Sequence, residues 1–285
     1  MRTINVLNLG AGVQSTALYL LFHEGKLPWK LDYAVFADTQ EEPADVYKHL
    51  DWLKSLGGAP ILMGTRGKLG EHLKHGANFR GGRFAAIPAF TTADGGTTVG
   101  KTRRQCTKDY KTDIIGQVIR REILGLAPGR TPKRNVHVNS FIGISLDEAG
   151  RAKRMERNVP APKYLTRFFP LIDMNWTRAA CRQYLEDRVP HRTPRSACVF
   201  CPFHNDYEWH LLKTEKPEEF ARAVEIDHAL RTTGSVANRD MRQTMYIHRS
   251  CKPLELVQFD ASPPKPKEVN MAFNFNEECE GMCGL

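Results

Sequence analysis

The hydrophobic residues in the first quarter of the chain form short continuous runs that alternate with runs of helical spacing. The continuous runs predict strands over 4–9, 33–37 and 59–63, and the spaced runs predict helices that begin at residue 15 and extend over 43–56. Strands and helices in alternation are typical of βαβ units, which build a parallel sheet. We therefore expect a ligand site beyond the carboxyl ends of the strands.

The rest of the chain continues the pattern after one interruption. Residues 76–105 are rich in Gly, Thr and Arg and lack periodicity, which predicts a long loop or lid. Beyond it the pattern predicts helices over 109–124, 177–187 and 206–231, with a strand over 136–144. The expected fold class is α/β, a doubly wound, mostly parallel, Rossmann-like sheet with a small C-terminal cysteine-containing region. The expected domains are 1–190, 191–261 and a flexible tail over 262–285.

Composition narrows the class of partner. The 285 residues are 41% hydrophobic and 26% charged, as in ordinary soluble proteins, and the formal net charge is +9. The positive excess favours an anionic partner, either a phosphorylated small molecule or a nucleic acid. The sequence shows neither a signal peptide nor an apolar run long enough to cross a bilayer. We therefore expect a cytoplasmic protein without a membrane partner; a homo-oligomer is left open.

A small-residue turn joins the first predicted strand to the first predicted helix. It consists of Gly10, Ala11, Gly12, Val13, Gln14, Ser15 and Thr16. Backbone N–H groups and hydroxyls at a helix N-terminus favour a phosphate, although a plain strand–helix turn would give the same pattern. The turn resembles the PP-loop, SGGxDST, of the adenine nucleotide α-hydrolase superfamily, with Gln14 in place of the acid. In that family the ATP-cleaving members use the acid, whereas sulfonucleotide reductases tolerate Gln.

Three further motifs extend the resemblance to the phosphoadenosine phosphosulfate (PAPS) reductase and DndC-like branch. The segment that begins Phe36-Ala-Asp38-Thr39 and ends at Tyr47 is similar to the reductases' DTG…FPETY segment, which lies beside the nucleotide. Asp38 would then accept hydrogen bonds from ribose or adenine, or else cap the next helix. The segment 103–111 resembles the segment of this branch in which one or two cysteines precede the basic start of a helix. The run 169–204 resembles the family's PL…WT…YL stretch before CxxCP, and the resemblance covers residues 4–205.

Basic residues in two clusters are candidates to bind phosphate or sulfate, although solvated surface charge is an equally simple explanation. These candidates are Arg103, Arg104, Lys108, Lys111, Arg151 and Arg154. Together with the PP-loop residues, Asp38 and Thr39, they form the expected site for an adenine nucleotide, which is PAPS, APS or ATP.

Seven cysteines without a secretion signal argue against a disulfide framework and point to metal or redox chemistry. The resemblance implies a [4Fe-4S] cluster, which four thiolates would hold: Cys106, Cys198, Cys201 and Cys251. Structural zinc accepts the same ligands, and His204 or His248 could substitute for one of them. Cys181 lies among apolar neighbours in a predicted helix, so we expect it to be a core residue.

The C-terminal tail contains Cys279 and Cys283, which resemble parts of the reductases' Glu-Cys-Gly end. In that family the cysteine attacks the sulfur of the nucleotide sulfate, and a second thiol can resolve the intermediate. These two residues are therefore the candidate catalytic nucleophiles, with a thiol reductant such as thioredoxin as a partner. Alternatively, they are incidental residues of a disordered end or further cluster ligands.

The motifs support three hypotheses for function. The leading one is PAPS reductase-like, thiol-dependent reduction of a sulfonucleotide to sulfite. The second is an ATP-using enzyme of nucleic-acid sulfur modification, DndC-like or tRNA-thiolase-like; the positive charge favours it and Gln14 counts against it. The third is a non-catalytic nucleotide-binding or nucleic-acid-binding module.

Overall fold

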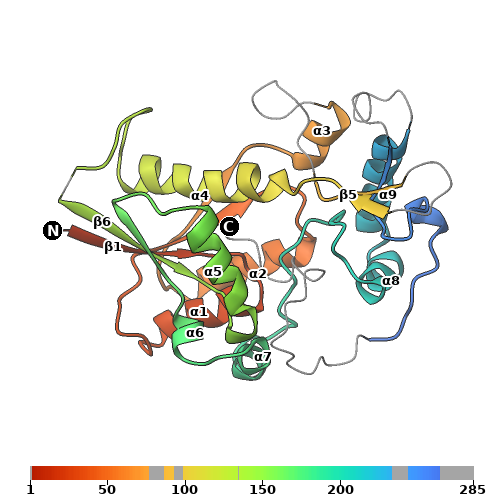
Figure 1. Ribbon diagram of the computed structural model, residues 1–285. Coiled ribbons are helices and arrows are strands. Elements are labelled where there is room, and N and C mark those ends of the chain that lie inside the picture. The colour runs from red at the N-terminus through yellow and green to blue at the C-terminus, as the bar shows by residue number, and fades with distance from the viewer. Residues whose placement is uncertain (1, 77–86, 93–98, 134, 233–242, 264–285) are drawn as a thin grey trace.

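A five-stranded parallel sheet forms the centre of the computed structural model, which describes residues 2–76, 87–92, 99–133, 135–232 and 243–263 (Figure 1). The strand order is β3-β2-β1-β6-β7. The strands are β1 (Arg2–Asn8), β2 (Tyr33–Asp38), β3 (Ile61–Thr65), β6 (Val136–Ile142) and β7 (Leu165–Phe168). All four pairings are parallel, with Val6 opposite Tyr33 and Ser140 in the central register. The expected α/β class with a mostly parallel sheet is confirmed.

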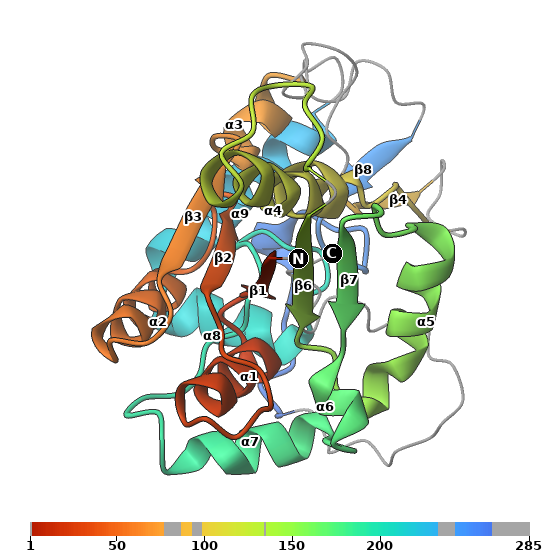
Figure 2. The ribbon, with the colours of Figure 1, turned by 90° about the vertical axis from the view of Figure 1, so that its left-hand side faces the viewer.

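Helices cover both faces of this sheet, because its strands bury side chains on both sides. On one face, Leu7, Ala34 and Phe141 pack with helices α1 (Val13–His23), α2 (Ala44–Ser55) and α7 (Arg178–Glu186). On the other face, Ile4, Val6 and Val35 pack against the continuous helical segment η1 (Thr107–Thr112), α4 (Asp113–Val118) and η2 (Ile119–Ile123). Figure 2 shows α4 on one side of the sheet and α1 with α7 on the other. The sheet is therefore doubly wound.

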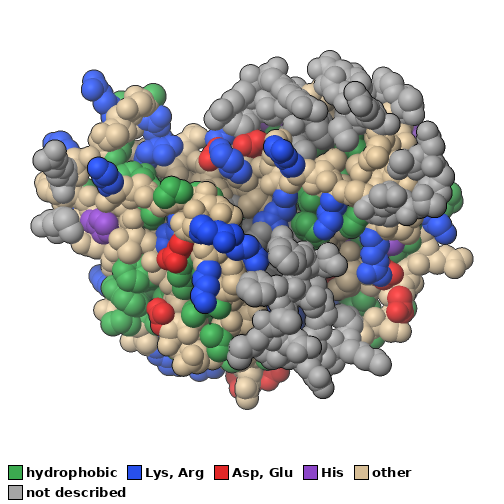
Figure 3. Space-filling view, viewed as in Figure 1, with side chains coloured by type: hydrophobic (Ala, Val, Ile, Leu, Met, Phe, Trp, Pro, Cys, Tyr) green, Lys and Arg blue, Asp and Glu red, His purple; other side chains and the backbone are tan. Residues whose placement is uncertain are grey.

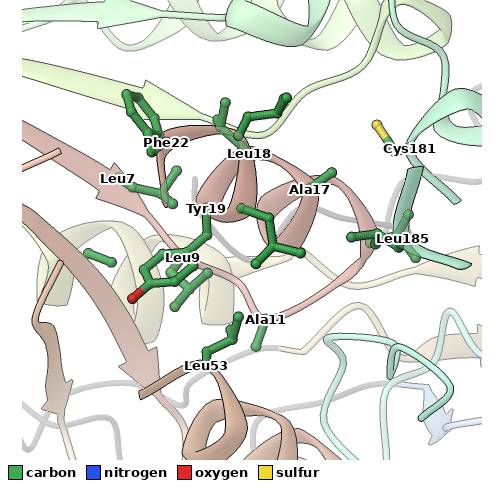
Figure 4. Packing of buried hydrophobic residues seen from close by; sticks show 14 of the residues in the cluster. Leu7, Leu9, Ala11, Ala17, Leu18, Tyr19, Phe22, Leu53, Cys181 and Leu185 are labelled. Atoms are coloured by element: carbon green, nitrogen blue, oxygen red, sulfur yellow. The ribbon is translucent and has the colours of Figure 1, made fainter. Parts of the chain in front are cut away.

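The core around α1 contains the cysteine that the sequence assigns to packing. Cys181 is fully buried on α7 in the cluster that Figure 4 draws, together with Leu18, Phe22 and Leu185. The prediction for Cys181 is confirmed. Short elements complete this part of the chain: η3 (Leu146–Glu148), α5 (Ala149–Asn158) and α6 (Pro170–Asp173).

A second apolar cluster lies toward the carboxyl end of the sheet. It joins α3 (Leu69–Lys74) and Tyr110 to residues 198–200, α8 (Asp206–Glu215) and α9 (Pro217–Arg231). An antiparallel sheet of order β5-β4-β8 borders it, and a short turn, η4 (Leu254–Leu256), follows. These strands are β4 (Phe90–Thr92), β5 (Val99–Lys101) and β8 (Thr244–Tyr246). This packing unites segments from both halves of the chain. The domain division at residue 190 stays a prediction.

Two of the expected elements differ in the structure. The segment 76–105 is not all loop, because β4 and β5 pair within it over a span too short for a periodic signal. The helix expected over 206–231 is two helices that meet at Lys216 and Pro217, since proline lacks the N–H that would continue the first helix. No helix in the described part of the chain is both long enough and apolar enough to span a membrane.

Candidate functional site

The turn between β1 and α1 lies where the order of the parallel strands reverses. Strands β2 and β6 flank β1 on opposite sides, and ligands of open parallel sheets bind beyond the carboxyl edge at such a reversal. Ala11 has a positive φ of 57°, which lets the chain reverse into α1. The N–H of Gly12 donates to Ser15 Oγ and the Ser15 hydroxyl lies near the Gly12 carbonyl, both at 3.2 Å. The PP-loop candidates therefore form one compact turn at a helix N-terminus.

The loop after β6 packs directly against this turn. A Cβ on Gly143 would lie 2.9 Å from the backbone nitrogen of Ser15, closer than side-chain carbons approach such atoms. Glycine is therefore required at residue 143 for the two loops to touch. On the opposite side, a Cβ on Gly12 would meet Ser196 at 3.5 Å, so the 195–198 segment lies over the turn.

This contact brings a carboxylate to Gln14. The Gln14 amide donates to Glu148 Oε2 at 2.9 Å and to Ser145 Oγ at 3.3 Å. Arg151 on α5 forms an ion pair of 2.7 Å with the other oxygen of Glu148. Burial raises the pKa of Glu148, and the guanidinium of Arg151 acts in the opposite direction. Glu148 was not among the site residues predicted from sequence, and its position 134 residues after Gln14 gives no local signal.

Asp38 ends β2 beside the next part of the edge. Its Oδ1 accepts hydrogen bonds from the Gln40 N–H at 2.7 Å and from the Tyr47 hydroxyl at 2.8 Å. The residue that precedes α2 is Pro43, so the alternative role of Asp38 as the cap of that helix is wrong. A contact of Asp38 with ribose or adenine stays a prediction.

Thr39 begins a buried polar group that links β2 to the cysteine motif. Its hydroxyl lies 3.3 Å from Glu42 Oε1 and 3.2 Å from Cys198 Sγ. Lys111 Nζ lies 3.1 Å from Glu42 Oε1, and both side chains are almost fully buried. Lys111, expected to bind phosphate or sulfate, thus forms an ion pair with a protein carboxylate. Glu42 was not among the predicted site residues, although it lies within the segment from Phe36 to Tyr47.

The predicted cluster ligands are only partly brought together. Cys198 is buried and Cys106 packs against the same apolar cluster, while the Cys201 N–H donates to the Cys198 carbonyl at 2.9 Å. Burial raises the pKa of Cys198 well above its usual value. Cys251 has a positive φ of 51°, and its N–H donates to the His248 carbonyl. Within the described ranges, no three His, Cys, Asp or Glu side chains are grouped so that they could hold a metal ion.

In the described ranges these cysteines are therefore not gathered into one donor set for a cluster or a zinc ion, and the metal stays a prediction. The two histidine substitutes have other partners. His204 lies 3.0 Å from the Cys198 carbonyl, and burial lowers the pKa of its imidazole to about 3. His248 lies 3.1 Å from Asp206. The candidate nucleophiles Cys279 and Cys283 lie outside the described residues.

The other candidate cations occupy different places. Lys108, Arg151 and Arg154 line a cavity of about 650 Å³ beside α4 and α5. Arg104 lies 5.9 Å from the centre of the Phe203 ring, and Arg103 is exposed in the segment before η1. The structure therefore collects three of the six candidates in one cavity.

A histidine on α2 that the sequence did not single out contacts the turn, and a second histidine contacts the first. His49 is fully buried, with Nε2 2.8 Å from Thr16 Oγ1 and Nδ1 2.8 Å from His191 Nε2. Burial, with a smaller effect of His191, lowers the pKa of His49 to about 4. His49 is therefore neutral at neutral pH and can orient the Thr16 hydroxyl.

Comparison with known proteins does not assign this chain to a family. No protein family model matches the chain, and a search of curated proteins finds no match. Among solved structures, the chain is similar to "U34-tRNA thiolase NcsA from Methanococcus maripaludis with its [4Fe-4S] cluster". The two chains are 13% identical with a TM-score of 0.36, and the match covers 80% of this chain and 71% of the other. At this level of similarity the match assigns neither a family nor an activity.

Proposed function

We propose that the chain is a PP-loop-type enzyme that binds ATP at the carboxyl edge of its parallel sheet and uses it to activate a target for sulfur transfer. The observation that carries the proposal is the 2.9 Å contact between Gln14 and Glu148. Gln14 occupies the place of the acid that ATP-cleaving members use, and Glu148 brings a carboxylate to the same place from another loop. The absence of an acid at residue 14 therefore does not argue against ATP cleavage, since Glu148 supplies the carboxylate.

The roles of the residues follow from their positions. The N-terminal amides of α1, an 11-residue helix, favour a phosphate, and the Ser15 and Thr16 hydroxyls lie in its first turn. A carboxylate beside a phosphate site is a ligand for the Mg²⁺ that accompanies ATP, which suits Glu148. Arg151 compensates the charge of Glu148 while it is buried. The target would attack the α-phosphorus and release pyrophosphate, and a sulfur nucleophile would then displace AMP.

The test is the release of pyrophosphate and AMP from ATP, measured with and without tRNA or DNA. We expect Glu148→Gln to lower the rate at least a hundredfold, since the amide keeps the size of the side chain but removes its charge. Glu156→Gln is the matched control, because Glu156 is an exposed acid on the neighbouring α5. Full activity of Glu148→Gln would contradict the assigned role.

Sulfonucleotide reduction is the second candidate, and Gln14 with the tail cysteines favours it. This reaction predicts sulfite from PAPS or APS in the presence of thioredoxin, without pyrophosphate release from ATP. Its formation should be lost in Cys283→Ser or Cys279→Ser. If neither reaction is detected while ATP still binds, the non-catalytic hypothesis is the one supported.

A further inference from the structure

The cavity of about 650 Å³ lies on the α4/α5 side of the sheet, over the ends of β1, β6 and β7. Its volume is within the range of small-molecule binding sites. It does not include the Gly10–Thr16 turn, although Asn8 at the end of β1 and Arg151 bring its wall close to that turn. The cavity is thus a neighbour of the proposed ATP site rather than part of it.

The lining of the cavity is strongly cationic. The basic residues are Arg66, Lys108, Arg120, Arg151, Arg154 and Arg167, and among the described lining residues Asp113 is the sole carboxylate. Asp113 is shared by Lys108 at 3.0 Å and Arg66 at 3.8 Å. Burial lowers the pKa of Arg167, as expected for a cation held away from water. Arg151 also pairs with Glu148 outside the lining. The lining residues together carry a net positive charge, which favours an anionic ligand.

The uncharged part of the wall combines polar residues, among them Ser140 and Asn158, with an apolar surface. Ile119 and Ile142 rise from η2 and β6, Met155 from α5, and the half-buried Tyr164 adds an aromatic ring. A ligand that fits this surface has a planar or apolar body as well as negative charge. Figure 2 shows α4 over one face of the sheet and α5 beside its β7 edge, and Figure 3, viewed as Figure 1, shows Lys and Arg side chains over both helices.

We propose that this cavity is a second nucleotide site, which takes a phosphate together with its base while ATP occupies the β1–α1 turn. The cations at the rim bind the phosphate, and the apolar wall with Tyr164 contacts the base. The nucleotide is either free or one unit of a strand, because the recognised chemistry is the same. The inference adds a second ligand to the proposed function and can be tested whether or not the turn binds ATP.

The probe is AMP, measured by equilibrium dialysis in the presence of a saturating non-hydrolysable ATP analogue. We expect one AMP per chain under these conditions. Arg120→Glu and Arg167→Glu, both in the lining of the cavity, should each weaken AMP binding at least tenfold and leave binding of the analogue unchanged. Arg130→Glu is the control, because Arg130 is exposed, lies outside the cavity and undergoes the same charge change. Circular dichroism melting of each variant checks that it folds.

Two results would overturn the proposal: the analogue displacing all AMP, which means a single shared site, or unchanged AMP binding in both cavity variants. The variant Ser15→Asp distinguishes failure of the second site from failure of the proposed ATP site. A negative charge in the turn should abolish binding of the analogue but leave AMP in the cavity. A six-nucleotide single-stranded RNA is the second arm: competition with AMP identifies a nucleotide within a strand, and its absence identifies a free nucleotide.

Discussion

The Nδ1 atom of His49 lies 2.8 Å from Nε2 of His191, while the other nitrogen of His49 contacts Thr16 at 2.8 Å. The two imidazoles thus connect the first turn of α1 to the surface. His191 lines a cavity of about 890 Å³ between α7 and α8, whereas His49 is fully buried and also stacks on Trp52. A hydroxyl of the candidate nucleotide site is therefore held by a group whose charge depends on pH.

The first prediction is that acid destabilises the fold through His49. Its pKa is about 4 in the folded state against 6.5 in the unfolded chain, so the unfolded state binds more protons between these values. Stability should fall as the pH drops from 6.5 to 4 and then level off. The maximum loss from this residue is about 3 kcal/mol. Urea unfolding at several pH values measures it.

His49→Gln is the matched variant, since an amide can still bond to Thr16 but does not titrate. Its stability should depend less on pH across the same window, with a residual slope from His204, whose pKa is also lowered. An identical slope in the variant and the wild type would exclude His49 as the source.

The second prediction concerns the buried ion pair of Lys111 and Glu42, whose charged atoms lie 3.1 Å apart. Lys111→Met should destabilise the protein by about 3 to 5 kcal/mol, because it leaves a buried carboxylate without its cation. Adding Glu42→Gln should recover part of the loss. Thermal or urea unfolding of the single and double variants makes the comparison; a double variant no more stable than Lys111→Met would contradict it.

The third prediction is that Gly143 is required for nucleotide binding. In Gly143→Ala the new methyl group would meet the Ser15 backbone at 2.9 Å, and a backbone atom cannot move away as a side chain can. We expect ATP affinity to fall at least tenfold in a titration followed by calorimetry. Gly116→Ala is the control, since its Cβ would meet only the end of the Arg120 side chain at 3.9 Å. Equal affinity in both variants would show that the contact is dispensable.

The fourth prediction is a metal content that depends on Cys198. Protein purified without oxygen should contain about four irons and four sulfides if the thiolates bind a cubane cluster. Cys198→Ala should lose them, whereas Cys181→Ala, which changes a core cysteine, should not. Stoichiometric zinc in the wild type would instead indicate a structural zinc site. The absence of both metals would contradict the assignment of these cysteines as ligands.

Local patterns in the sequence are sufficient for much of the fold. The apolar runs predict β1, β2 and β6, because a strand buried on both faces needs continuous hydrophobic residues. They also predict β3, although this edge strand is only partly buried. The same alternation places the Gly10–Thr16 turn at a carboxyl edge. Local patterns do not predict α5, because its polar sequence buries only Arg151, Ala152 and Met155. They also do not predict β4 and β5, which are very short.

The parallel α/β architecture, the position of the small-residue turn and the burial of Cys181 can be predicted from the sequence, because each depends on neighbours along the chain. The charged groups that meet are seen in the folded structure alone. Glu148 reaches Gln14 across 134 positions, and Lys111 reaches Glu42 across 69. Such partners are set by the order of strands in the sheet and by how closely Gly143 lets two loops approach. Periodicity describes which side of an element is buried, but not what lies opposite it.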